Sequence, residues 1–142
     1  REAKKGIENL WNFPSGKVRV GESLIEAAQR EALEETGYRI KLTGLCSIYH
    51  YPWDSDEGIS IRFNFWGEKT SDDQQKLAKD VLEVHPLTKD ELRRIIERKD
   101  YRFGGVPLMI SDVLKNKKVN MNTLLTTNRS IEKAWKNADK NL

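Results

Sequence analysis

Hydrophobic and polar positions in the first third of the chain predict one amphipathic helix. The run Ser23-Leu24-Ile25-Glu26 has the spacing of a capping box, in which the Ser and Glu side chains bond to each other's backbone N–H groups. Gly37 suits the position just past the last helical turn, because glycine readily adopts the left-handed conformation found there. The sequence therefore predicts a helix of about three and a half turns between these two signals.

The rest of the chain alternates between strand and helix patterns. Short apolar runs or alternating residues predict these strands: 10–13, 39–51, 59–66 and 81–86. Helical periodicity predicts these helices: 88–99, 108–114 and 130–142. We expect the acidic loop 52–58 to join two strands as a hairpin, 67–79 to be a loop, and the last helix to dock on the domain or on a partner.

Composition and charge exclude several classes of protein. The chain has 142 residues, with 37% hydrophobic and 33% charged, as in one soluble globular domain. No apolar run approaches the roughly 20 residues that span a bilayer. The lone Cys46 cannot form an internal disulfide, so we expect an inert core thiol and a cytoplasmic protein. The net charge of +3 is too small to indicate a nucleic-acid partner.

Three glutamates share one face of the first predicted helix. At roughly 100° per residue, Glu31, Glu34 and Glu35 fall within an arc of about 100°. Like charges at this spacing repel one another, and Arg30 can reach Glu26 or Glu34 but not the whole set. Mg²⁺ and Mn²⁺ prefer carboxylate oxygens, so the cluster indicates a divalent metal site. The competing interpretation is a charged surface helix without a ligand.

The surrounding string is more specific than the acids alone. It contains, in order, Gly16, five residues, Glu22, seven residues, Arg30-Glu31, Ala32, Leu33, Glu34-Glu35, Thr36, Gly37 and Tyr38. This resembles the box of the Nudix hydrolase superfamily, Gly-x5-Glu-x7-Arg-Glu-U-x-Glu-Glu-x-Gly-U, where U is a bulky aliphatic. Every fixed position is matched. Ala32 is small for its U site, Tyr38 is aromatic, and Ser15 stands where many members have Gly.

The resemblance implies a fold. Nudix domains are α+β proteins, α/β/α sandwiches in which helices flank a mixed β-sheet. We therefore expect residues 1–142 to form a single domain of this kind. In the family a strand pair precedes the box, so we expect the N-terminal strands to be missing from this chain.

The resemblance also implies roles for the residues of the box. Arg30 is similar to a structural partner that holds the glutamates in place, and Glu22 to a residue that orients the helix. Glu31 resembles either a further metal ligand or the general base. The positions implied around Mg²⁺ or Mn²⁺ are Gly16, Glu31, Glu34 and Glu35.

Residues outside the box suggest substrate contacts. Core packing is the favoured interpretation of Trp11 and Phe13, and stacking on a nucleobase is the alternative. Arg102 lies between aromatic residues and is suited to clamping a phosphate or a base. Family members often supply one more carboxylate from the segment before the second helix, and Glu83 and Asp80 are the candidates.

Together these features predict Mg²⁺-dependent hydrolysis of a phosphoanhydride bond in a nucleoside di- or triphosphate or a related organic diphosphate. No signature of another nucleophile is present, which leaves a metal-activated water. Segments along the chain are similar to a MutT-like bacterial subgroup that acts on nucleoside tri- and diphosphates and a thiamine precursor. Sugar nucleotides, dinucleoside polyphosphates and capped RNA are alternative substrates. A non-catalytic Nudix-fold module that binds a nucleotide is the rival, and the family leaves a homodimer open.

Overall fold

The first helix is built as its sequence predicts. The structure, a computed structural model, describes residues 9–52, 59–71 and 74–119. Helix α1 spans Leu24–Thr36. The Ser23 hydroxyl accepts from the Glu26 N–H at 3.1 Å, and the Glu26 carboxylate accepts from the Ser23 N–H at 2.8 Å, so the capping box is confirmed. Gly37 ends the helix at φ 73°, where a side chain would also collide with the Gln75 carbonyl.

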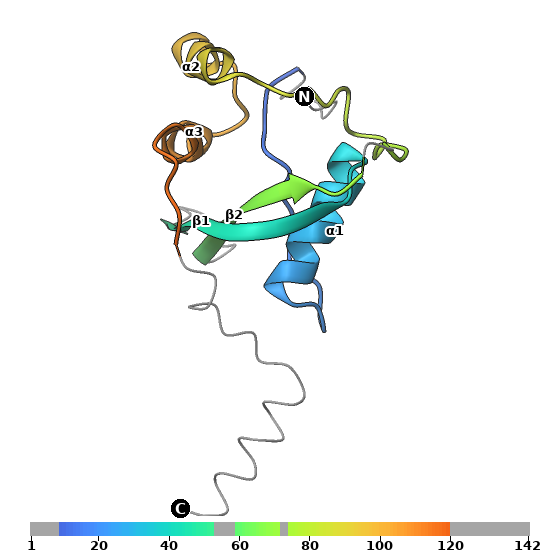
Figure 1. Cartoon of the computed structure of the whole chain (residues 1–142). Helices are drawn as coiled ribbons and strands as arrows, with labels where there is room; N and C mark the ends of the chain where they lie inside the picture. The colour runs from blue at the N-terminus through green and yellow to red at the C-terminus, as the bar shows by residue number, and fades with distance from the viewer. Residues whose placement is uncertain (1–8, 53–58, 72–73, 120–142) are drawn as a thin grey trace, which may run out of the picture.

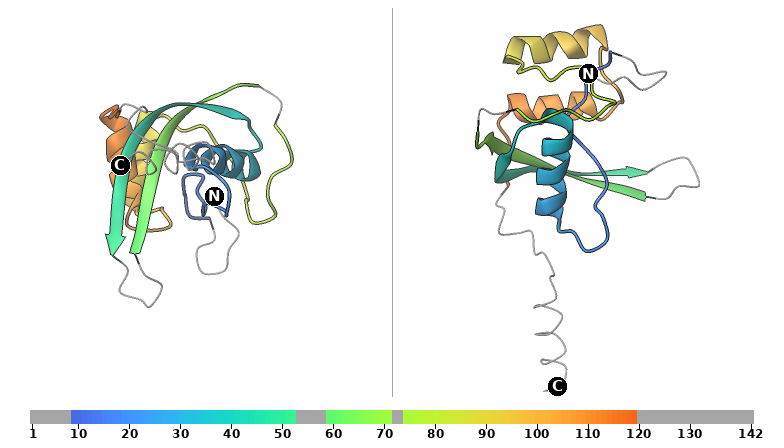
Figure 2. Two further views of the ribbon diagram at one scale, coloured as in Figure 1. Left: turned by 90° about the horizontal axis from the view of Figure 1, so that it is seen from below. Right: turned by 90° about the vertical axis from the view of Figure 1, so that its right-hand side faces the viewer.

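A long, curved hairpin lies against α1. Strand β1 spans Ile40–Pro52, and strand β2 spans Ile59–Lys69. They pair antiparallel, with His50 opposite Ile61, and the register shifts twice between Leu42 and Ser47. The predicted hairpin is therefore confirmed. Strand β2 runs three residues past its predicted end, so the loop predicted at 67–79 is shorter by those residues. Figure 2 shows how strongly the paired strands curve, with α1 lying inside the bend.

Two further helices follow the hairpin. Helix α2 spans Lys89–Arg98 within the predicted range 88–99, and Thr88 caps its N-terminus in a capping box with Glu91. Helix α3 spans Val106–Leu114 and begins two residues earlier than predicted. The early start follows from Pro107, because a proline in the first turn loses no helical hydrogen bond. In Figure 1, α2 and α3 lie together toward one end of the molecule and α1 toward the other.

The main apolar core lies between α2 and α3. Its buried residues are Leu92, Ile95, Val106 and Ile110. Trp11 and Phe13 pack against this cluster, so the core role favoured for them is confirmed. The α+β class is also confirmed. Among residues 9–52, 59–71 and 74–119 the regular sheet has two antiparallel strands, and the parallel pairing described there is one isolated bridge between Trp11 and Tyr101.

Two predicted strands are wrong. Within 10–13 only Trp11 forms a bridge, and within 81–86 only Val81 does. Alternating residues mark a segment with one buried face, and packing against helices produces that pattern as well as strand pairing does. The predicted helix 130–142 lies outside the described residues, and the single domain 1–142 stays a prediction. Within the described ranges, no helix has the length and apolar character that crossing a membrane requires.

Candidate active site

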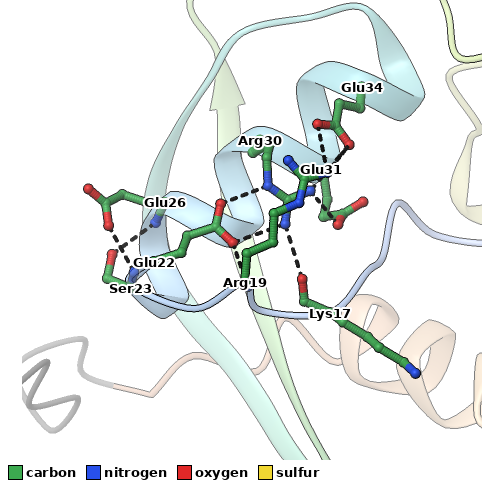
Figure 3. Close-up of polar contacts among 8 residues, drawn as sticks. All are labelled: Lys17, Arg19, Glu22, Ser23, Glu26, Arg30, Glu31 and Glu34. Atoms are coloured by element: carbon green, nitrogen blue, oxygen red, sulfur yellow. Dashed lines mark hydrogen bonds and ion pairs between the residues drawn. The ribbon is translucent and has the colours of Figure 1, made fainter.

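Arg30 links α1 to the loop that precedes it. Its Nε and Nη2 atoms donate to the two carboxylate oxygens of Glu22 at 2.7 and 3.0 Å, and Nη2 also donates to the Lys17 carbonyl at 3.1 Å (Figure 3). The side chains of Arg30 and Glu22 are only 17% and 14% exposed. A bidentate pair of this kind fixes both position and orientation. Glu22, for which the sequence resemblance implied a role in orienting the helix, is therefore fixed to α1 through Arg30.

Hydrogen bonding shifts the pKa values of this pair. The Arg30 guanidinium, and then the Arg19 backbone N–H at 3.0 Å, hold the pKa of Glu22 at about 2. The bonds to Glu22 and Glu31 raise the pKa of Arg30 further above its ordinary value. Both groups are consequently charged at neutral pH.

Two arginines also reach the glutamates of α1. Arg30 Nη1 donates to Glu31 at 2.5 Å and to Glu34 at 3.2 Å. Arg19 Nη2 donates to both Glu34 oxygens at 3.3 and 3.4 Å. The predicted reach of Arg30 to Glu34 is confirmed, while Glu26 is engaged in the helix cap. Sequence reasoning missed Arg19, because its side chain reaches Glu34 only through the fold of a loop.

The turn at residues 15 and 16 contacts two of the glutamates of α1, Glu31 and Glu35. Ser15 N–H donates to Glu35 Oε2 at 2.9 Å. A Cβ atom added to Gly16 would lie 1.9 Å from Glu31 Oε1, so the backbone runs directly against this carboxylate, and any side chain at this position would displace it. Glu31 and Glu35 therefore converge on one backbone turn although they belong to successive turns of the helix.

These residues fit a divalent cation in the chemistry of their side chains, but their oxygens are not gathered around one point in the arrangement described. Glu31, Glu34 and Glu35, which we call the carboxylate cluster, carry the oxygen atoms that hard divalent cations prefer, and Gly16 lies directly against Glu31. In the arrangement described, the arginines hold Glu31 and Glu34. Within the described ranges, no three His, Cys, Asp or Glu side chains are grouped as metal ligands. A cation would therefore have to draw a carboxylate away from an arginine.

A cavity of about 470 Å³ opens beside the last turn of α1. Its volume lies within the usual range of small-molecule sites, about 300–1,000 Å³. Glu35 forms part of one wall. Four aromatic residues share the lining: Trp11, Phe13, Phe65 and Trp66. We call this space the aromatic cavity. None of the described residues that line it is a lysine or an arginine.

The structure brings two of the three predicted substrate residues, and one of the four predicted metal residues, to this cavity. Trp11 and Phe13 line it as well as packing on the core, and the candidate carboxylates Asp80 and Glu83 line it with Glu35. The backbone N–H of Arg102 donates to the Trp11 carbonyl at 3.0 Å, but Arg102 is not among the lining residues. Its role as a clamp stays a prediction.

Other polar groups lie away from the cavity. Arg62 stacks on Phe103, with 4.2 Å from its Cζ to the ring centroid. On α3, the buried Asp112 accepts from the Tyr49 hydroxyl and pairs with Lys117 Nζ at 2.6 Å. Burial and then the bond to Asp112 raise the pKa of Tyr49 to about 12. Sequence reasoning missed these contacts, although a single acid in an otherwise apolar helix was a visible signal for Asp112.

Cys46 is buried as predicted, at 5% exposed, and this burial raises its thiol pKa. A buried thiol of this kind has little thiolate character. The site geometry therefore gives no support to a cysteine nucleophile.

The sequence profile of the NUDIX domain matches residues 1–104 of this chain. The chain belongs to the NUDIX domain family. A solved NUDIX hydrolase from Nitrosomonas europaea is 32% identical and superposes with a TM-score of 0.71 over 82% of this chain and 78% of that one. The likeness extends well beyond the box, so the NUDIX fold is shown for the chain.

Two curated NUDIX relatives carry informative names. The ADP-ribose pyrophosphatase of Bacillus subtilis is 30% identical over 70% of this chain and 55% of its own length. The oxidized purine nucleoside triphosphate hydrolase of Danio rerio is 34% identical over 58% of this chain and 46% of its own. The first relatives matched, from Bacillus subtilis and Caenorhabditis elegans, are covered over only 32% and 31% of their length.

NUDIX hydrolases generally use divalent metals and act on nucleotide substrates, whereas the activity, metal and substrate of this chain are proposals. The individual roles of the box residues, dimerisation and a cytoplasmic location stay predictions.

Proposed function

We propose that the chain hydrolyses a phosphoanhydride bond in a nucleoside di- or triphosphate or a related organic diphosphate. The convergence of Glu31 and Glu35 on the turn at Gly16, beside the aromatic cavity, is the single observation that carries this proposal. This observation supports the proposal because carboxylate oxygens and a space for an organic group lie next to each other. A substrate with a phosphate chain on one side and an aromatic ring on the other matches that arrangement.

The proposed metal residues are Gly16, Glu31, Glu34 and Glu35, holding Mg²⁺ or Mn²⁺. When bound, the ion supplies charge neutralisation for the substrate phosphates and makes water more acidic. If Glu31 acts as the general base and not as a further ligand, its carboxylate would accept the proton of the attacking water. Arg30 acts through the glutamates, so it is a positioning residue.

The cavity favours a nucleotide with one aromatic base. Trp11 and Phe13 line the cavity, and a nucleobase can stack on aromatic rings of this kind. A dinucleoside polyphosphate would bring a second nucleotide, whose phosphate would need positively charged side chains. None of the described lining residues is a lysine or an arginine. The two named relatives act on ADP-ribose and on oxidized purine nucleoside triphosphates, which both carry a purine. We therefore place purine nucleoside tri- and diphosphates ahead of dinucleoside polyphosphates, and keep ADP-ribose as the second candidate.

A panel of substrates tests the proposal against a non-catalytic nucleotide-binding module. Phosphate and pyrophosphate release are measured for nucleoside tri- and diphosphates, ADP-ribose and a dinucleoside polyphosphate, with Mg²⁺, with Mn²⁺ and with EDTA. We expect release that requires metal and that is fastest for a purine nucleotide. Absence of metal-dependent release from every substrate, together with retained nucleotide binding, would identify a binding module instead.

A further inference from the structure

Arg19 holds Glu34 from a position that no part of the box requires. It lies among the five unspecified residues between Gly16 and Glu22. Its Nη2 atom donates to both Glu34 oxygens, and its backbone N–H donates to Glu22 at 3.0 Å (Figure 3). The backbone is therefore anchored while the side chain reaches outward to the carboxylate.

The two arginines that contact Glu34 differ in how easily their ion pairs with it can be broken. Arg30 is 17% exposed and is tied to Glu22, Glu31 and a backbone carbonyl besides Glu34. Arg19 is 62% exposed, and Glu34 is 42% exposed. Ion pairs between exposed side chains are weak and are screened by salt. The Arg19–Glu34 pair is thus the part of the network that a competing cation breaks first.

We propose that Arg19 exchanges partners when the site is loaded. Without metal, its guanidinium pairs with the Glu34 carboxylate and balances the negative charge. A divalent ion bound at the carboxylate cluster takes Glu34, and the released guanidinium then binds the phosphate oxygens of the substrate, a group that arginine contacts well in bidentate form. This inference rests on the metal site of the proposed function.

The exchange has two opposite consequences for a variant. Arg19→Gln removes the competitor, so the metal should bind more tightly in the absence of nucleotide. It also removes a phosphate contact, so the nucleotide should bind more weakly once metal is present. A pair that only fastens the loop would change stability and neither affinity.

Two equilibrium titrations of the whole chain test this without turnover. Mn²⁺ affinity is measured from the free-ion signal in electron paramagnetic resonance. Nucleotide affinity is measured by calorimetry with a non-hydrolysable purine triphosphate at saturating Mn²⁺. For Arg19→Gln we expect Mn²⁺ to bind about two- to fivefold more tightly, with the gain shrinking at high salt, and the nucleotide to bind several-fold more weakly.

Two further variants serve as controls. Arg19→Lys keeps the charge and should restore most of the competition for the metal. Lys17→Gln removes a charge from the same loop, but the Lys17 side chain points away from the glutamates (Figure 3), so it should change Mn²⁺ affinity by less than about 1.5-fold.

Each outcome has one meaning. Unchanged or weaker Mn²⁺ binding by Arg19→Gln, when the unmodified chain binds Mn²⁺, overturns the exchange but leaves the metal site standing. An equal gain in Lys17→Gln overturns it too, since loop charge alone would then explain the effect. Tighter metal with unchanged nucleotide binding overturns the phosphate contact. If neither protein binds Mn²⁺, the proposed function itself fails.

Discussion

The carboxylate cluster and the aromatic cavity lie side by side, but the chain builds them in different ways. The cluster and its arginines come from one continuous stretch, with a turn at 15–16, a loop and α1. The cavity is assembled from distant segments, including Trp11, Phe65 and Ile110. The cluster is held by directional charged bonds, whereas the cavity is held by packing. Chemistry should therefore depend steeply on small changes in the cluster, and substrate choice should depend more gradually on the cavity.

The largest effect is expected from removing one charge in the cluster. Glu35→Gln should lower kcat/KM by about 100- to 1,000-fold, because it neutralises a proposed metal ligand. The glutamine oxygen can still accept from Ser15 N–H, so the melting temperature should change little. Steady-state kinetics and thermal melting check both parts.

Glu26→Gln is the matched control for that substitution. Glu26 lies on the same helix but caps its N-terminus, and glutamine can fill the same capping position. Its activity should stay near that of the unmodified chain. Equal losses in the two variants, or near-normal activity of Glu35→Gln, would contradict the ligand assignment.

A methyl group at the turn should have the next largest effect. Gly16→Ala places Cβ where the Glu31 carboxylate lies, so that carboxylate must move, and we expect kcat/KM to fall about 10- to 100-fold. Gly104→Ala is the control, since its Cβ meets nothing within 4 Å. If both variants keep full activity, the close approach of Gly16 and Glu31 has no catalytic meaning.

These two predictions concern the region that sequence reasoning described best. The bounds of α1, its capping box and the hairpin followed from local patterns, because they depend on residues a few positions apart. The extra strands at 10–13 and 81–86 were wrong because alternation reports a buried face and not its partner. Arg19 and the cavity were missed, since each depends on how a loop or several distant segments fold.

A change in the cavity should alter substrate choice by a smaller factor. Trp11→Leu should raise KM for a purine nucleoside triphosphate by about tenfold through lost stacking, with little change for inorganic triphosphate, which has no base. Trp11 also packs on the core, so the melting temperature of this variant is measured alongside. Equal losses on both substrates would show a packing role only.

The smallest effect concerns pH and stability. The pKa of Glu22 is held at about 2, below its ordinary 4.5, so its ionised form stabilises the folded chain fully above about pH 4.5. That contribution is lost as pH falls from 4.5 toward 2. Glu22→Gln should therefore lower the melting temperature most at neutral pH, and the difference from the unmodified chain should narrow with acid.

The exposed Glu97 on α2 provides the comparison for this titration. Glu97→Gln should produce a small difference in melting temperature at neutral pH, because an exposed side chain contributes little to stability. A difference for Glu22→Gln that is no larger, or that widens in acid, would show that the Arg30–Glu22 pair does not stabilise the fold.

A crystal structure grown with Mn²⁺ and a non-hydrolysable purine triphosphate tests the central claim most directly, because anomalous scattering locates the ion. We predict a peak about 2.1–2.2 Å from oxygens of Glu31, Glu34 and Glu35, with the phosphate chain beside it and the base between the aromatic side chains of the cavity. A nucleotide bound elsewhere, with no peak at the cluster and Arg19 and Arg30 still paired with the glutamates, would contradict the account.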